Sequence, residues 1–195
     1  MSTSACKWVA SFVVCVGVLY LGLAYPLPAI AGQPQKADVI DIASGAVVGT
    51  SQLVRSPNGV AMNLRTTGLD PGAAYTVWWV IFNNPEFCED FCNEPDLFNP
   101  DVLATVLGAT GHVIGHDGVG NFAAYLAEGD TSDVAPFGLP GDAVGLIDST
   151  QAAIHLVVRT HGPPIPGHVK EQISTFGGGC DVNACEDQQF AAHAP

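Results

Sequence analysis

Short apolar runs, separated by Gly, Pro, Asn and Asp, limit what this chain can fold into more than any other feature. The chain carries 22 Gly and 14 Pro among 195 residues, and no segment after the first 31 residues keeps a helical apolar period. In residues 59–66, by contrast, the apolar side chains alternate, so that Val60, Met62 and Leu64 share one face. Period-two alternation between turn-forming residues is typical of half-buried strands. The sequence therefore predicts an all-β protein.

We expect strands at residues 39–43, 46–54, 59–66, 74–82, 103–107, 112–114, 120–127, 152–160 and 188–193, and one short helix at residues 168–175. Residues 74–82 are apolar on both faces, so this strand should be central and covered on both sides. Long loops should occupy residues 83–101 and 129–148. Short strands with long turns favour an antiparallel β-sandwich, immunoglobulin-like in the simplest case, with a closed barrel as the alternative.

The first 31 residues have the order of a secretory signal. Lys7 precedes an apolar run over residues 8–25, two prolines follow, and the segment ends in Ala29-Ile30-Ala31. A charged region, an apolar region and a small-residue cleavage site are expected in this order. We predict a signal peptide at residues 1–31, a short tail at 32–36 and one domain at 37–195. The run is also long enough for an uncleaved membrane anchor, which is the competing interpretation. Both place the domain outside the cytosol, secreted or periplasmic.

The charge balance excludes some partners. Residues 32–195 hold all 19 acidic residues and only five basic ones, which gives a formal charge of −14. Such a chain repels phosphate backbones and anionic membrane surfaces, so we expect no nucleic acid partner. No second apolar stretch of spanning length follows the leader, so we expect no stable membrane insertion after cleavage. An extracellular protein or a cell-surface component remains a possible partner.

Four cysteines follow the leader: Cys88, Cys92, Cys180 and Cys185. An even number in an exported chain indicates two disulfides. Sequence alone allows three pairings. We favour two local bridges, Cys88–Cys92 and Cys180–Cys185, over bridges between the two loops. A zinc site formed by the four thiolates is disfavoured by the spacings and by an oxidising compartment.

Two segments resemble known proteins. Residues 68–79 (GLDPGAAYTVWW) and 154–163 (IHLVVRTHGP) are similar to a group of uncharacterised exported bacterial proteins. They also resemble the chordin-type (CHRD) and copper–zinc superoxide dismutase-like β-sandwiches, which carry a comparable G-L-x-P-G turn before a core strand. The resemblance covers about residues 59–193 and implies a CHRD-like sandwich. The dismutase-type His-x-His ligands are missing after the turn, where residues 75–79 stand instead, so superoxide chemistry is not implied.

Histidines are the first candidates for a metal site. His155, Arg159 and His161 fall on one face of the predicted strand 152–160 and its extension. This face is most simply a solvated or rim-facing polar stripe, with Arg159 paired to an acid on a neighbouring strand. A copper or zinc site formed by His155, His161 and His193 is conceivable. However, His155 and His161 are six residues apart, which on an ideal strand is a distance of roughly 20 Å. They could share one ion only if the strand bends.

The acidic loop is the second candidate. Glu89, Asp90, Glu94 and Asp96 offer hard oxygen ligands to calcium, although their spacing does not fit an EF-hand. A solvated loop closed by Cys88–Cys92 is the simpler interpretation.

Catalytic motifs are absent: no Gly-x-Ser-x-Gly and no His-Glu-x-x-His occur. We assign no catalytic residue and no cofactor, and whether the chain is an enzyme is left open. The leading hypothesis is a secreted, non-enzymatic β-sandwich with a binding or structural role at the cell exterior. The alternatives are a metal-binding protein or enzyme and a calcium-stabilised adhesion module.

Overall fold

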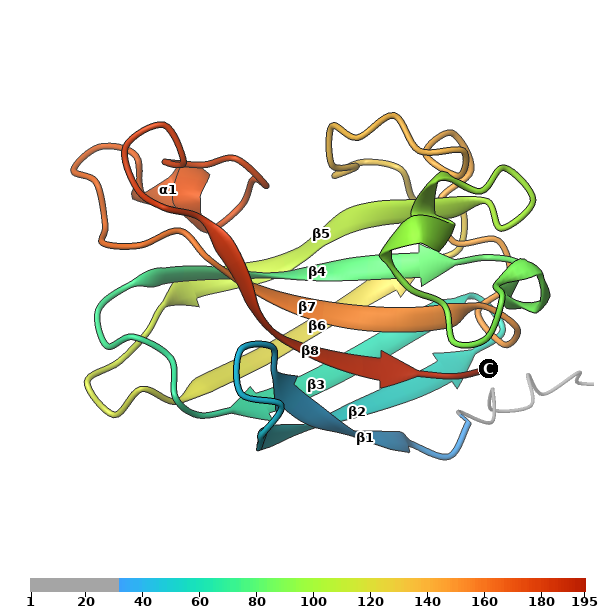
Figure 1. The fold of residues 1–195 in the computed structure, drawn as a ribbon, viewed down its shortest axis with the longest axis horizontal. Helices are drawn as coiled ribbons and strands as arrows, with labels where there is room; N and C mark the ends of the chain where they lie inside the picture. The colour runs from blue at the N-terminus through green and yellow to red at the C-terminus, as the bar shows by residue number, and fades with distance from the viewer. Residues whose placement is uncertain (1–31) are drawn as a thin grey trace, which may run out of the picture.

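The computed structural model describes residues 32–195, so the predicted signal peptide lies outside the described residues. The described part is all-β, with eight antiparallel strands and one short helix (Figure 1). The strands are β1 (Gln35–Asp41), β2 (Val47–Ser56), β3 (Gly59–Thr66), β4 (Ala74–Phe82), β5 (Ala104–Val113), β6 (Gly120–Ala127), β7 (Ala153–Thr160) and β8 (Glu186–His193). The helical pieces are α1 (Val169–Gln172) and the 3-10 turns η1 (Pro85–Phe87) and η2 (Glu94–Phe98).

The strands form one folded sheet in the order β5-β4-β7-β8-β1-β2-β3-β6. Strands β5, β4, β7 and β8 make one layer and β1, β2, β3 and β6 the other, so that the sheet folds back on itself (Figure 1). The expectation of an antiparallel sandwich is confirmed, and the shape also approaches that of a barrel. Among residues 32–195 no helix is long and apolar enough to cross a membrane.

The alternating faces of the strands explain the main core. Tyr75, Val77, Trp79 and Ile81 of β4 point between the layers and are almost fully buried. They meet apolar side chains of β2, β3, β6 and β7, such as Leu53, Leu64, Phe122 and Leu156. Burial of this alternating set is what holds the two layers together.

Strand β4 also buries its other face, as its apolar composition predicts. Trp78 and Phe82 are only 3% and 1% exposed, although they point away from the main core. They are covered by loop residues, including Leu139 and Val102, in two smaller apolar clusters. The outer face of the β5-β4-β7-β8 layer is therefore covered by loops, and this is where the candidate site forms.

Two strand predictions differ from the structure. The predicted strands 103–107 and 112–114 are one strand, β5, in which Ala109 is an extra residue opposite the Val77–Trp78 step. This bulge lets both halves of β5 pair with β4. Residues 32–36 are not wholly a tail, because β1 begins at Gln35 and pairs there with Leu53 of β2.

Candidate binding site

An apolar groove lies on the outer face of the β5-β4-β7-β8 layer, and we call it the outer groove. Its volume is about 460 Å³. Trp78, Val80 and Phe82 of β4 form its floor, together with Val157 of β7 and Phe190 of β8. These side chains share the outward-facing positions of their strands, so the sheet itself positions them.

Three loops supply the walls of the outer groove. Leu97 and Phe98 come from η2, Phe137 from the loop between β6 and β7, and Phe176 from the segment after α1. Phe98 is 63% exposed and Phe137 42% exposed, although both border an apolar space. Phe176 packs edge-on against the rings of Trp78 and Phe137. The result is an aromatic site that is open to solvent.

The polar groups of the outer groove are acidic or neutral. Asn93, Glu94, His155 and Asp187 line it, and no lysine or arginine does among the described residues. Asp187 is paired with Arg159, at 2.7 Å from Oδ1 to Nη1. The guanidinium of Arg159 also lies 4.1 Å from the centre of the Phe176 ring. The prediction that Arg159 pairs with an acid of a neighbouring strand is therefore confirmed by the structure.

A second hollow, the terminal cavity, lies where β7 begins and β8 ends. Its volume is about 860 Å³, and its lining includes Glu86, Asp90, Asp148, His155 and His193. Because Ile154 pairs with His193 and His155 with Ala192, the two histidines leave opposite faces of the sheet. The ring of His193 turns inward, where its Nε2 lies 2.9 Å from Ser51 Oγ.

Burial keeps both histidines of the terminal cavity neutral. The pKa of His155 falls from 6.5 to about 4, mainly because burial disfavours the imidazolium and secondarily because His193 lies near. The pKa of His193 also falls to about 4, through burial first and Arg55 second. Of the two expected settings, the solvated stripe is not found, because His155 is only 9% exposed and the Arg159 side chain 14%.

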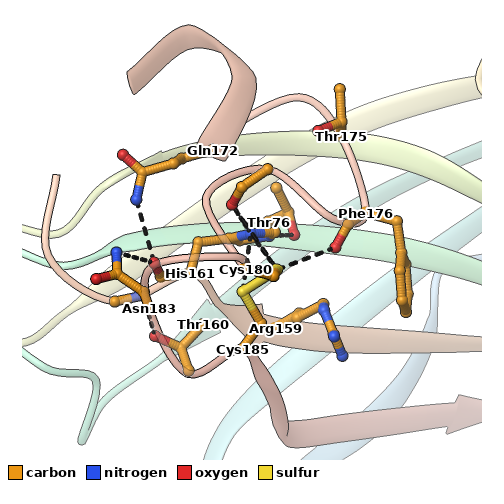
Figure 2. Close-up of a disulfide and its surroundings, with 12 residues drawn as sticks. Thr76, Arg159, Thr160, His161, Gln172, Thr175, Phe176, Cys180, Asn183 and Cys185 are labelled. Atoms are coloured by element: carbon orange, nitrogen blue, oxygen red, sulfur yellow. Dashed lines mark hydrogen bonds between the residues drawn. A yellow bond between two sulfur atoms is a disulfide. The ribbon is translucent and has the colours of Figure 1, made fainter. Parts of the chain in front are cut away.

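The third predicted histidine, His161, is fully buried beneath the loop that Cys180 and Cys185 close (Figure 2). Its Nδ1 lies 2.8 Å from the carbonyl oxygen of Gly178, and its Nε2 lies 2.8 Å from Thr76 Oγ1. A carbonyl can only accept, so Nδ1 carries the proton and Nε2 accepts from the threonine hydroxyl. The pKa of His161 is lowered, mainly by burial.

The same imidazole touches the disulfide. His161 Nδ1 lies 3.8 Å from Cys180 Sγ and 3.7 Å from Cys185 Sγ (Figure 2). Among residues 32–195 these three residues are the only group of at least three His, Cys, Asp or Glu side chains whose ligand atoms lie within 4.8 Å of one another. Both sulfur atoms are joined to each other in the disulfide, so neither is available to bind a metal ion in this state.

The metal candidates from the sequence are consequently not brought together. His155 and His193 leave opposite faces at one end of β7, and His161 follows its other end. The structure gives no geometric support to a three-histidine site. The calcium candidates Glu89, Asp90, Glu94 and Asp96 also form no cluster of three close oxygens in the described part of the chain. Asp96 instead caps η2, where its Oδ2 accepts from the Asn93 N–H at 2.8 Å.

The cysteine pairing is the one favoured from the sequence. Disulfides join Cys88 to Cys92 and Cys180 to Cys185, with Cα–Cα distances of 5.2 and 5.4 Å. The Cys88–Cys92 bridge closes a loop that borders the terminal cavity, and the Cys180–Cys185 bridge closes the loop above His161. The sequence did not reveal the groove itself. One sequence feature could have indicated the groove. The loops between β4 and β5, between β6 and β7 and between β7 and β8 all carry phenylalanines, Phe98, Phe137 and Phe176 among them.

Comparisons with known proteins show no family for this chain. No family model matches the chain, and no curated protein matches it. Among solved structures, a mutant of an SOD-like protein from Bacillus subtilis is similar, with a TM-score of 0.39 and 14% identity over 82% of this chain and 97% of that chain. The similarity to the exported bacterial group and to CHRD sandwiches stays a prediction.

Proposed function

We propose that this protein is an extracytoplasmic, non-enzymatic binding protein, and that the outer groove is its ligand site. One observation carries the proposal. Four strands and three separate loops converge on an aromatic space that is open to solvent, and two of its wall residues, Phe98 and Phe137, stay largely exposed. Exposed apolar side chains that surround a concave apolar floor are a common sign of a binding site.

The extracytoplasmic location is supported by the two disulfides and by the leader pattern of the sequence. The bridge between Cys88 and Cys92 closes a short loop directly before η2, whose Leu97 and Phe98 line the groove. Such bridges fix binding loops in place without a large core beneath them, which lowers the entropic cost of holding a ligand.

The groove chemistry favours a ligand that is small and largely apolar, with a neutral or positive charge. A volume of about 460 Å³ suits a small organic molecule. Glu94 lines the groove and no basic side chain does among the described residues. An anionic amphiphile would therefore meet carboxylates, whereas a cation would meet both Glu94 and the aromatic faces.

The test is binding of the neutral apolar dye N-phenyl-1-naphthylamine to the mature protein. We expect saturable fluorescence enhancement at one site, with displacement by a cationic amphiphile and little displacement by an anionic one of equal chain length. Phe98→Ser should weaken dye binding about tenfold. Phe87→Ser is the matched control, because Phe87 is 51% exposed in the same acidic loop but does not line the groove. Absence of saturable binding, or equal weakening by both variants, would overturn the proposal.

A further inference from the structure

The arrangement around His161 assigns a second property to this chain, independent of the outer groove. We propose that reduction of the Cys180–Cys185 disulfide creates a binding site for one zinc ion, formed by the two thiolates and His161 Nδ1. In the oxidised protein the Nδ1 atom lies 3.8 and 3.7 Å from the two sulfurs, almost equidistant from them. All three candidate ligand atoms already lie within 4.8 Å of one another.

The chemistry of the three atoms favours this metal. Thiolate sulfur and imidazole nitrogen are the ligands that zinc prefers, and a set of two cysteines and one histidine leaves a fourth position for water. The sulfurs need only move apart by rotation about their Cα–Cβ bonds once the bond between them is broken. Both cysteines are partly exposed, so a reductant and a metal ion can reach them, while the imidazole is buried below.

Hydrogen bonds that do not involve the disulfide hold His161 in place. The His161 N–H donates to the carbonyl oxygen of Ala74, and the His161 carbonyl accepts from the side-chain amides of Gln172 and Asn183. Figure 2 shows the side-chain amides of Gln172 and Asn183 directed at the carbonyl oxygen of His161. Asn183 lies between the two cysteines in sequence, and its amide also donates to the carbonyl oxygen of Pro163. These bonds keep both the ring and the cysteine loop in place after reduction.

The imidazole also has a route to release its Nδ1 proton. Thr76 Oγ1 lies 2.8 Å from Nε2 and accepts from Trp78 Nε1 at 2.7 Å. A hydroxyl can accept as well as donate a hydrogen bond. The imidazole can therefore change to the tautomer that is protonated at Nε2, and this N–H donates a hydrogen bond to Thr76 Oγ1. Nδ1 then gives up its hydrogen bond to the Gly178 carbonyl and offers its lone pair to the metal. The ring keeps its orientation through the threonine, as metal-bound histidines do through an outer partner.

The reaction balances with a dithiol as reductant. The dithiol gives two electrons and two protons to the Cys180–Cys185 bond and becomes a disulfide itself, which leaves two thiols on the protein. Zinc then displaces one proton from each thiol as two Zn–S bonds form. Reoxidation would expel the metal, so the site would exist only under reducing conditions.

The two disulfides of the chain provide matched variants. Cys88→Ser with Cys92→Ser keeps the proposed site, and Cys180→Ser with Cys185→Ser removes it, whereas each variant retains one closely spaced pair of thiols. We expect the first variant, reduced by a dithiol that is then removed, to bind one zinc ion by competition with a chromogenic chelator. Cobalt substitution should add a thiolate-to-metal charge-transfer band. The second variant should bind no zinc after the same treatment, and neither variant should bind zinc when oxidised.

The role of His161 is tested within the first variant. His161→Gln should lower zinc affinity at least tenfold and change the cobalt spectrum. Gln52→Asn, at an exposed position of β2 in the other layer, should change neither. Circular dichroism on each reduced variant checks that the fold persists. Equal zinc binding by the two double-serine variants, or no binding by the variant that keeps Cys180 and Cys185, would overturn the proposal.

Discussion

The ring of Phe91 stacks on the imidazole of His155, with ring centres 5.0 Å apart and planes 19° from parallel. Phe91 belongs to the Cys88–Cys92 loop and is 55% exposed, whereas His155 lies on the outer face of β7 and is 9% exposed. His155 borders both the outer groove and the terminal cavity, and Phe91 borders only the cavity. His155 therefore lies between the two hollows, and Phe91 covers its ring on the side of the terminal cavity.

Replacing Phe91 by Ala should enlarge the terminal cavity and expose His155 to water. Because burial is the main cause of its low pKa, the pKa of His155 should rise from about 4 toward 6.5. Titration of the His155 ring proton signals by nuclear magnetic resonance measures this change. Phe87→Ala is the control, since Phe87 lies in the same loop away from the imidazole. An unchanged His155 pKa in the Phe91 variant would contradict the assignment.

Acid should destabilise the protein through its buried histidines. His155 and His193 have folded-state pKa values of about 4 against an ordinary value of 6.5, so between these pH values the unfolded chain binds more protons than the folded one. Stability is then fully present above pH 6.5 and is lost as the pH falls to about 4, by on the order of 3 kcal/mol for each histidine. Urea unfolding at several pH values measures it.

The matched variants for this pH dependence are His155→Gln and His116→Gln. The first removes one of the two buried imidazoles, so the decline in unfolding free energy between pH 6.5 and 4 should become shallower. The second changes an exposed histidine of the β5–β6 turn and should leave the slope as it is. Parallel slopes in all three proteins would show that the buried histidines do not cause the acid sensitivity.

Arg55 ties together parts of the chain that are far apart in sequence. Its guanidinium donates to the carbonyl oxygens of Ser149, Ala152 and Ala194, and its Nε donates to Gln35 Oε1. Arg55→Met would leave three carbonyl groups without this donor and should lower the free energy of unfolding by about 3 kcal/mol. Arg65→Met, at an exposed position of β3, should change it by less than about 0.5 kcal/mol. Equal losses in chemical denaturation would show that the buried network is not what stabilises this end of the sandwich.

Most of the fold could be predicted because it depends on local patterns. Alternation in residues 59–66 and apolar composition on both faces of residues 74–82 located β3 and β4 at their observed bounds. The split prediction for β5 failed where Gly108 and Gly111 look like strand breakers. In the structure the bulge at Ala109 and the pairing with β4 continue the strand through both glycines, a tertiary effect with no local signal.

The site was less predictable because it depends on which loops meet. His161 and Cys185 are 24 residues apart, and nothing in their spacing indicates that Nδ1 lies against the sulfur. The polar stripe of β7 was expected to face solvent, since only the sequence of one strand was considered. Loops folded over the outer face bury His155 instead, and they supply Phe98 and Phe176 to the groove.

The close approach of α1 to the sheet gives the last prediction. Gly111 of β5 lies directly beneath the carbonyl oxygen of Ile173, the residue that ends α1. A Cβ at Gly111 would collide with that oxygen and would lie 2.6 Å from the carbonyl oxygen of Tyr75. Both obstacles are backbone atoms, so relief requires the α1 segment to move away from the sheet and the pairing of β5 with β4 to shift.

Gly111→Ala should therefore lower the free energy of unfolding by about 1–3 kcal/mol. Gly177→Ala is the matched control, because no atom lies within 4 Å of its added Cβ and its φ is not positive. It should change stability by less than about 0.5 kcal/mol. Thermal and urea unfolding of the two variants measure the difference. If Gly111→Ala proved as stable as Gly177→Ala, α1 would not be packed on the sheet as closely as described, and the position of the loop that covers His161 would have to be revised with it.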